Sequence, residues 1–482
     1  MDAVTTHDCC DCCASSRTAT PDLVVIGAGS AGFSAAIRAS ELGANVALIG
    51  HGTIGGTCVN IGCVPSKTLI RAAEAFHHAK SSSRFAGIAG AARINDWSAL
   101  IAQKDQLVAD LRGAKYQALL PEYETIRYVQ GRARFTDAGI EAGGAIFPAD
   151  RVVIATGASA AVPAIPGMDE VPYLTSTTAL ALDRLPKSLL IIGGGVIGCE
   201  LGQMFARFGV AVTIVCRTRL LPAGEPEISE SLAGYMRDEG ITIRDGAQYE
   251  RIRRSETGIA LDVMIEDRAE TIEAERVLNA TGRTANTSDM GFEAAGIALD
   301  RNGSIMTDEH LATRRPGTYA AGDVTGRDQY VYMAAYGAKL AAENVLNGNA
   351  RRYDSRAMPT VVFTDPQYAS VGLTEAEARR DSHEVRTVRL DLAALPRALA
   401  ARDTRGLIKL VAEAGSLRLL GAHILAPESA DSIQTAVLAI KHNLTVTDLA
   451  ETLFPYLTTV EGLKLASLGF QKDVAKLSCC AG

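Results

Sequence analysis

Paired cysteines carry most of the chemistry that this sequence offers. Eight of its ten cysteines lie in short pairs: Cys9-Cys10, Cys12-Cys13, Cys58 with Cys63, and Cys479-Cys480. Adjacent α carbons are about 3.8 Å apart, which is shorter than the roughly 4.4–6.8 Å that disulfides usually span. We therefore interpret Cys479-Cys480, followed by Ala481 and Gly482, as a ligand pair for a two-coordinate soft metal ion.

The inner pair lies in the stretch GGTCVNIGCVPSK, residues 55–67. Four residues separate Cys58 from Cys63, which is enough to close a disulfide loop. Pro65 suits the first turn of a helix, so Cys63 is expected just before the helix, where the N-terminus favours a thiolate. The pattern predicts a redox-active pair, with an inert structural disulfide as the alternative.

Two glycine fingerprints predict the elements around these cysteines. Gly27, Gly29 and Gly32 follow an apolar strand and precede a helix, and the same unit returns over 188–217. Such turns let a pyrophosphate approach the backbone at a helix N-terminus. Each unit therefore predicts a doubly wound dinucleotide-binding domain. The first unit departs from the usual pattern, because Gly50 stands where an acid normally contacts the adenosine ribose.

The second fingerprint consists of Gly193, Gly195 and Gly198, and its second strand ends in Cys216-Arg217. No carboxylate is present there to hold a free 2′-hydroxyl. Arg217 and Arg219 are suited to a 2′-phosphate instead, which favours NADPH. The alternative is that both arginines are surface residues and that NADH binds.

Composition narrows the class of protein. The chain has 482 residues, of which 47% are hydrophobic and 21% charged, with a net charge of −7. These values are typical of a soluble protein of about three domains, and they do not favour nucleic acid or an anionic membrane as partner. No apolar run predicts a membrane span. The first residues do not resemble a secretory signal, so the cysteines indicate a reducing cytoplasm.

The sequence thus predicts an α/β protein with two Rossmann-like domains and a C-terminal α+β domain, which the family resemblance of the chain implies to be a dimerisation domain. Helices are expected over 60–80 and 97–120. We expect a Cys-rich flexible arm over 1–20, an FAD-binding domain over 21–160 and 281–352, an NADPH-binding domain over 161–280, and an interface domain with a Cys-Cys tail over 353–482.

From about residue 20 onward, the chain resembles the flavin-dependent pyridine nucleotide–disulfide oxidoreductases. The similarity rests on the two fingerprints, on the Cys58–Cys63 motif, and on ATG at 155–157, ATGRTANT at 280–287 and TYAAGDV at 318–324. Ala285 departs from the family, which usually has proline there. By this resemblance the FAD contacts are Gly27, Gly29, Gly32, Gly56, Thr57, Lys67, Thr156, Gly157 and Asp323, and the NADPH contacts are Gly193, Gly195, Gly198, Arg217, Arg219 and Gly282.

The resemblance also implies a catalytic set of Cys58, Cys63, Tyr456, Cys479, Cys480, Lys67 and Glu200. Lys67 and Glu200 match a pair that the family places near flavin and nicotinamide, although Glu200 is open to the simpler interpretation of a solvated helix residue. Most disulfide-reducing members carry a histidine in His-Pro-Thr-x-x-Glu, where this chain has Tyr456. A tyrosine, with a pKa near 10, is a poor proton shuttle at neutral pH; a packing role is the alternative.

Tyr456 and the terminal cysteine pair resemble the branch of the family that reduces mercury(II). That resemblance implies a homodimer that takes Hg(II)-thiol complexes. Cys479 and Cys480 of one subunit would bind Hg and pass it to Cys58 and Cys63 of the other, and NADPH would supply the electrons through FAD. Many members of the branch begin with a folded metal-binding domain, whereas this chain has only CCDCC, which is either a mercury trap or dispensable.

Two other functions stay open. One is an NADPH-dependent disulfide reductase of the thioredoxin reductase or dihydrolipoamide dehydrogenase type. The missing histidine disfavours the dihydrolipoamide dehydrogenase type. The other is a flavoprotein that sequesters mercury without turnover, which two intact nucleotide fingerprints disfavour.

Overall fold

A computed structural model describes residues 20–473 and residue 476. The cysteines expected in the N-terminal arm and the terminal pair lie outside the described residues: Cys9, Cys10, Cys12, Cys13, Cys479 and Cys480.

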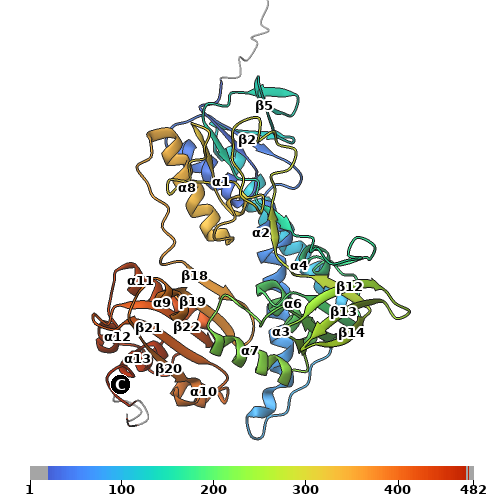
Figure 1. Ribbon diagram of the computed structural model, residues 1–482, viewed down its shortest axis with the longest axis vertical. Coiled ribbons are helices and arrows are strands. Elements are labelled where there is room, and N and C mark those ends of the chain that lie inside the picture. The colour runs from blue at the N-terminus through green and yellow to red at the C-terminus, as the bar shows by residue number, and fades with distance from the viewer. Residues whose placement is uncertain (1–19, 474–475, 477–482) are drawn as a thin grey trace, which may run out of the picture.

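The first unit is built on a five-stranded parallel sheet. Its order is β17-β7-β1-β2-β3, with β1 Leu23–Ile26, β2 Val46–Gly50, β3 Ile126–Gln130, β7 Val152–Ile154 and β17 Thr318–Ala320. Helices α1 (Ser30–Glu41) and α8 (Val331–Asn347) pack side by side on it (Figure 1). The inner strands are apolar throughout because both faces of the sheet are covered.

The second unit repeats this design. Its parallel sheet has the order β11-β10-β9-β15, with β9 Ser188–Ile192, β10 Ala211–Val215, β11 Thr242–Arg244 and β15 Arg276–Asn279. Helices α6 (Val196–Arg207) and α7 (Pro226–Asp238) belong to this unit, and an antiparallel sheet follows in the chain, formed by β12 (Gln248–Arg254), β13 (Ile259–Ile265) and β14 (Arg268–Ala274).

The third unit is an antiparallel sheet with helices. Its order is β18-β19-β22-β21-β20, with β18 Pro359–Val362, β19 Gln367–Gly372, β20 Val385–Asp391, β21 Leu407–Glu413 and β22 Leu419–Ala426. Its own apolar core includes side chains from α11 (Ser429–Lys441), α12 (Val446–Glu451) and α13 (Glu461–Leu468). Two units with parallel sheets and a third unit of antiparallel strands and helices confirm the predicted fold class.

The remaining α-helices and β-strands of the described chain are short. They are β4 Arg134–Thr136, β5 Gly139–Ala142, β6 Ala145–Phe147, β8 Ala158–Ala160, β16 Arg283–Ala285, α5 Ser176–Ala179, α9 Glu375–Arg380 and α10 Pro396–Ala401. Strands β8 and β16 pair with each other, so the ATG and ATGRTANT segments lie side by side although more than 120 residues separate them.

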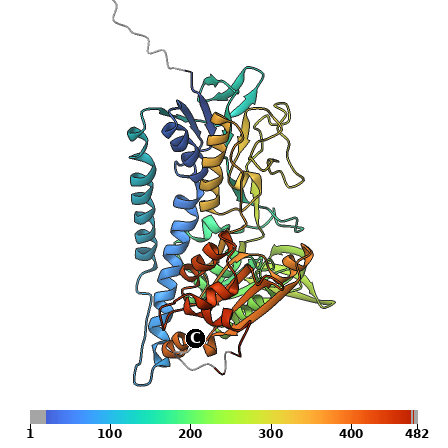
Figure 2. The same ribbon diagram turned by 90° about the vertical axis from the view of Figure 1, so that its left-hand side faces the viewer.

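The helix expected over 60–80 is two helices. Gly62 adopts φ −123° and ψ −112° and separates α2 (Gly56–Ile61) from α3 (Cys63–Lys80). Cys63 is therefore the first helical residue rather than the residue before the helix. The helix expected over 97–120 is shorter: α4 spans Trp97–Arg112 and is followed by a π turn over 113–117. Figure 2 shows α3 running from the first unit down beside the third, with α4 alongside it.

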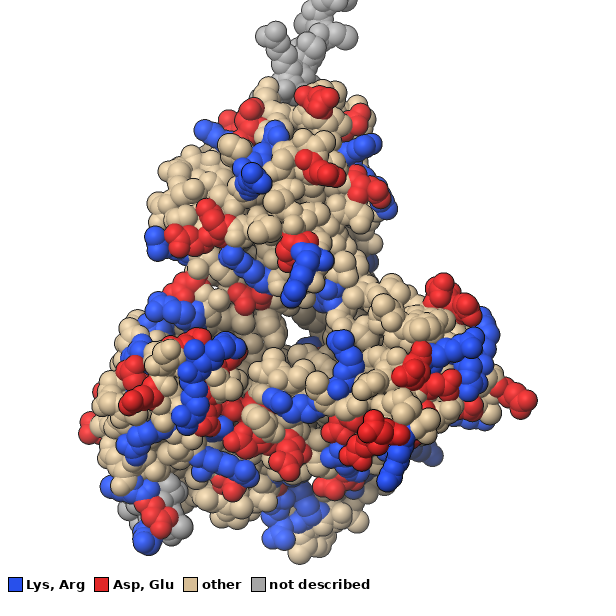
Figure 3. All heavy atoms as spheres, in the orientation of Figure 1, with Lys and Arg blue, Asp and Glu red and all other residues tan. Residues whose placement is uncertain are grey.

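The surface carries both signs of charge. On the face seen in Figure 3, basic and acidic side chains are interspersed, and an opening lies between the upper part of the molecule and the two lower parts. No helix within the described residues is long and apolar enough to cross a membrane.

Candidate active site

The turn between α2 and α3 holds two thiols. Cys58 lies in α2 and is half-buried, whereas Cys63 begins α3 and is exposed. Neither thiol is in a disulfide, and each lies near enough to the other to shift the pKa of its partner. The structure thus brings together the two cysteines that the sequence singled out.

The two thiols differ in acidity. The hydrogen bond from Cys58, together with the Lys67 ammonium and a backbone N–H, lowers the pKa of the Cys63 thiol to about 6, although Glu200 and the partial desolvation of the sulfur within this otherwise exposed residue oppose that shift. The same hydrogen bond, with burial, raises the pKa of Cys58. At neutral pH the pair therefore holds one thiolate, on Cys63, and one thiol, on Cys58.

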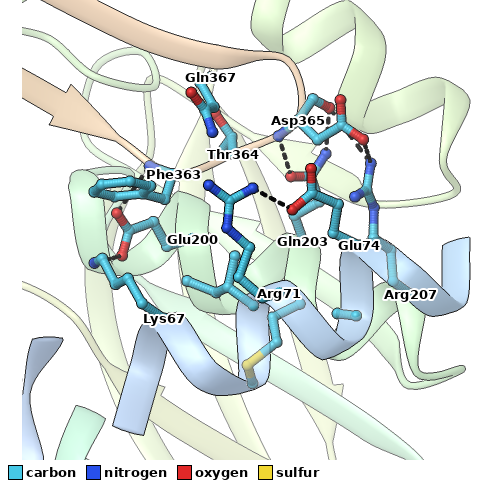
Figure 4. A pocket seen from close by; sticks show the side chains of 13 residues that line it. Lys67, Arg71, Glu74, Glu200, Gln203, Arg207, Phe363, Thr364, Asp365 and Gln367 are labelled. Carbon is cyan, nitrogen blue, oxygen red and sulfur yellow. Dashed lines mark hydrogen bonds and ion pairs between the residues drawn. The ribbon is translucent and has the colours of Figure 1, made fainter. Parts of the chain in front are cut away.

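An ion pair lies one helical turn beyond Cys63. Lys67 Nζ is 2.7 Å from Glu200 Oε2, and the Glu200 side chain is only 5% exposed. The Phe363 backbone N–H donates to Glu200 Oε1 at 2.9 Å, and Lys67 Nζ lies 4.9 Å from the centroid of the Phe363 ring. Figure 4 shows these three side chains together, from α3, from α6 and from the segment after β18. Glu200 is thus a buried contact between units and not a solvated helix residue.

The first glycine turn has the shape of a pyrophosphate cradle. Gly27 has φ +115°, and a Cβ there would lie 2.2 Å from the Ala155 carbonyl oxygen. A Cβ on Gly56 would lie 2.5 Å from the Gly29 α carbon. Side chains are therefore excluded where the backbone of α1 begins, and no side chain caps that helix. A dinucleotide such as FAD fits this turn.

Two further segments border the same sheet edge. Asp323 follows β17 and lies 3.5 Å from Arg283 Nη2. Burial raises the pKa of the Asp323 carboxyl, while Arg283 opposes that rise. Thr156 Oγ1 donates to the Asn286 carbonyl at 2.8 Å, and the Asn286 N–H donates to the Gly157 carbonyl at 2.9 Å. The structure thus joins the ATG segment to the Asp323 turn through residues 283–286.

The second glycine turn repeats the first. Gly193 also has φ +115°, and a Cβ there would lie 2.4 Å from the Ala280 carbonyl oxygen. A Cβ on Gly198 would lie 2.0 Å from the Gly193 carbonyl oxygen. This turn fits a second dinucleotide. The exposed Gly282 follows Ala280 by two residues.

The two arginines expected at the 2′-phosphate differ in their surroundings. Arg219 Nη2 donates to the Pro222 and Gly224 carbonyls at 3.0 and 2.8 Å, so its guanidinium is engaged in the loop after β10. Arg217 is exposed. Of the two, Arg217 is the more accessible to a ligand.

Tyr456 lies apart from the thiols in sequence and in element. It is in the loop between α12 and α13 of the third unit, and 47% of it is exposed. Within the described residues, no group of three or more histidine, cysteine or acidic side chains is placed to hold a metal ion.

Three contacts were not foreseen from the sequence. They are the Phe363 amide on Glu200, Arg283 beside Asp323, and Asn286 between Thr156 and Gly157. Arg283 and Asn286 lie within the ATGRTANT segment, so this motif marked the part of the sequence from which the two contacts come. Phe363 has no such motif, since it is placed only by the packing of the third unit.

Comparison with known proteins gives the same architecture. The family model described as pyridine nucleotide-disulphide oxidoreductase matches residues 21–342, and the dimerisation domain of that family matches residues 358–467. Among solved structures, the HOCl-induced flavoprotein disulfide reductase RclA from Escherichia coli, as its Cu(II) complex, has a TM-score of 0.80 at 32% identity, over 93% of this chain and 99% of that one.

Individual relatives are similar over nearly the whole length. The mercuric reductase of Lysinibacillus sphaericus is 47% identical over 96% of this chain and 84% of its own. The mercuric reductase of Streptomyces lividans is 46% identical over 96% of this chain and 98% of its own.

Proposed function

The chain belongs to the pyridine nucleotide-disulphide oxidoreductases, and on that premise we propose that it reduces Hg(II) to Hg(0) with NADPH as electron donor. The reaction balances as NADPH + Hg(II) → NADP⁺ + H⁺ + Hg(0), in which a hydride carries both electrons. The observation that carries the proposal is the Cys58–Cys63 thiol pair with an acidic Cys63. The similarity of the chain to enzymes named mercuric reductase supports mercury as the metal that is reduced.

The chain's own residues hold two dinucleotides. Gly27, Gly29 and Gly32 leave room for the pyrophosphate of FAD, and Asp323 lies at the same sheet edge. When bound, FAD supplies a two-electron relay between pyridine nucleotide and thiols. Gly193 and Gly198 provide the equivalent turn for the nicotinamide dinucleotide.

The thiol pair suits a soft two-coordinate ion. Cys63 attacks as a thiolate at neutral pH, and Cys58 loses its proton when the metal replaces that proton on sulfur. Each transfer of Hg(II) exchanges one thiolate ligand for another, so bonds of the same kind break and form. Lys67, one turn along α3, stabilises the negative charge on Cys63.

The residue at position 456 separates metal reduction from disulfide reduction. Cleavage of a disulfide substrate requires a proton for the departing thiolate, and histidine suits that task near neutral pH. Reduction of Hg(II) releases a neutral atom, so the product itself requires no proton, and the Cys58 sulfur regains from solvent the proton that the metal displaced. Tyr456 therefore suits the proposed reaction and disfavours a disulfide substrate.

Delivery of the metal is assigned to the partner subunit. The match to the family's dimerisation domain supports a homodimer. We place Cys479 and Cys480 of one subunit at the thiol pair of the other, where they would exchange Hg(II) with Cys58 and Cys63. A reducing cytoplasm would keep all four thiols available.

The deciding experiment measures NADPH oxidation by the purified, FAD-loaded protein with Hg(II) and excess thiol, together with the release of volatile mercury. We expect one mercury atom per NADPH. Binding of Hg(II) without NADPH oxidation would favour a sequestering protein, and turnover with lipoamide, glutathione disulfide or thioredoxin but not with Hg(II) would favour a disulfide reductase.

A further inference from the structure

The end of β2 has a glycine because another side chain fills the space beside it. Gly50 is buried, and its φ is not in the left-handed region, so its backbone suits any residue. A Cβ built there would lie 2.6 Å from Tyr128 Oη and 2.7 Å from the Ala28 Cβ. The side chain of an acid, which is usual at this position, is therefore excluded by Tyr128 and Ala28.

Sheet register brings Tyr128 to this place. In the parallel pairing of β2 with β3, Leu48 lies opposite Tyr128 and Gly50 opposite Gln130. The Tyr128 hydroxyl donates to Gln130 Oε1 at 2.8 Å. Gln130 ends β3, and Tyr128 lies two residues before it and reaches toward that end of the strand through this hydrogen bond; the carboxyl ends of the strands are where open parallel sheets bind ligands.

The pair lies beside the first glycine turn. The Gly27 N–H donates to the Ile49 carbonyl at 2.7 Å, so the cradle is attached to the residue that precedes Gly50. The nearby His51 accepts a hydrogen bond from Arg132 Nε at 3.1 Å, which engages its Nε2. Tyr128 and Gln130 are thus the polar groups that stand where the usual carboxylate would be.

We propose that the Tyr128 hydroxyl and the Gln130 amide together bind the adenosine ribose of the dinucleotide held at the first glycine turn. After donating to Gln130, the Tyr128 oxygen still accepts a hydrogen bond from a ribose hydroxyl, and the Gln130 amide N–H groups donate to ribose oxygens. A carboxylate only accepts. The inference rests on the proposed function in one respect, the presence of FAD at this turn.

The test is titration of the apo-protein with FAD and with its 2′-deoxyadenosine analogue, followed by flavin fluorescence. We expect the parent to bind FAD roughly 3–10-fold more tightly, as one hydrogen bond would give. Tyr128→Phe should reduce that preference, because only the Gln130 contact with the ribose remains. Tyr123→Phe is the matched control, because Tyr123 packs partly buried against the same apolar core, and it should keep the preference.

A second pair of variants tests whether Tyr128 occupies the space of the acid that is usual at position 50. Gly50→Glu should weaken FAD binding, since its Cβ meets Tyr128 and Ala28, and adding Tyr128→Ala, which removes the closer of these two contacts, should restore part of the affinity. An unchanged preference in Tyr128→Phe, or normal binding by Gly50→Glu alone, would overturn the proposal. Failure of the parent to bind FAD at all would overturn this proposal and the proposed function together.

Discussion

Lys67 and Glu200 form an ion pair, 2.7 Å long, whose two charges act in opposite directions on the same thiol. The Lys67 ammonium lowers the pKa of Cys63 and the Glu200 carboxylate raises it. The pair joins α3 to α6, so the acidity of the thiol depends on contact between the first and second units.

Substitution of each partner should therefore shift the acidity of Cys63 in opposite senses. We expect Lys67→Gln to raise the pKa of Cys63 by about one unit and Glu200→Gln to lower it. The rate of Cys63 alkylation as a function of pH measures both. Lys80→Gln, at the far end of the same helix, is the control and should leave the profile unchanged. A shift in the same direction for both variants would contradict the assignment.

Cys58 should control the reactivity of Cys63 through their hydrogen bond. With a pKa of about 6, Cys63 of the reduced protein is mainly thiolate above pH 6, and its alkylation should slow as the pH falls through that value. Cys58→Ala removes the largest stabilising contact, so the midpoint should move up by at least about one unit. Cys199→Ala should have no effect, because Cys199 is buried and its thiol stays protonated. A midpoint that stays near pH 6 in Cys58→Ala would show that the hydrogen bond is not the cause.

The sequence predicted the two nucleotide units well because their signals are local. Each strand, glycine turn and helix follows within about 25 residues, and the φ of +115° at Gly27 and at Gly193 is what the fingerprint requires. The Lys67–Glu200 pair is 133 residues apart in sequence and came only from family resemblance.

Other features of the site depend on tertiary packing. Phe363 reaches Glu200 because the third unit packs against α6, and Tyr128 reaches Gly50 because of the register of β3 on β2. No spacing in the sequence encodes either contact. The backbone of Gly62 determines that α3 begins at Cys63. The prediction from Pro65 alone put the start of this helix one residue too late.

A buried ionic cluster should stabilise the junction between the second and third units. Arg207 Nη2 and Arg405 Nη2 lie 2.8 and 3.1 Å from the two Asp365 carboxylate oxygens. Burial alone would raise the pKa of Asp365, but His78, Arg207 and Arg405 hold it well below its usual range. Asp365→Asn leaves two arginines without this anion, and we expect a loss of about 3 kcal/mol in the free energy of unfolding at pH 7.

The pH dependence of that loss has a definite sign. A carboxylate whose pKa is depressed by folding stabilises the protein above its unfolded pKa, about 3.9, and this contribution is lost as the pH falls through the folded pKa. The difference between parent and Asp365→Asn in thermal midpoint should therefore shrink below about pH 4. Asp354→Asn, which affects an exposed pair with Arg356, should change the midpoint little at any pH.

The preference for NADPH should depend mainly on Arg217. Arg217 is exposed, whereas the Arg219 guanidinium is bonded to loop carbonyls. Arg217→Ala should raise KM for NADPH roughly tenfold, as the loss of one charge-assisted contact would, with KM for NADH nearly unchanged. Arg254→Ala, an exposed arginine of the adjoining antiparallel sheet, is the control. Equal changes of KM for both nucleotides would refute a 2′-phosphate contact.

Delivery of metal across the dimer can be tested by mixing two inactive variants. Cys479→Ala/Cys480→Ala should retain FAD reduction by NADPH but lose turnover of Hg(II) held by a strong chelator, because the proposed carrier is missing. Cys58→Ala should lose metal reduction with any ligand.

In a mixed dimer, the intact tail of the Cys58→Ala subunit can serve the intact thiol pair of the other subunit. Refolding the two together should therefore restore one working site in each mixed dimer. If each tail served its own subunit, no mixed dimer would turn over, and the mixture would be as inactive on chelated Hg(II) as the separate variants.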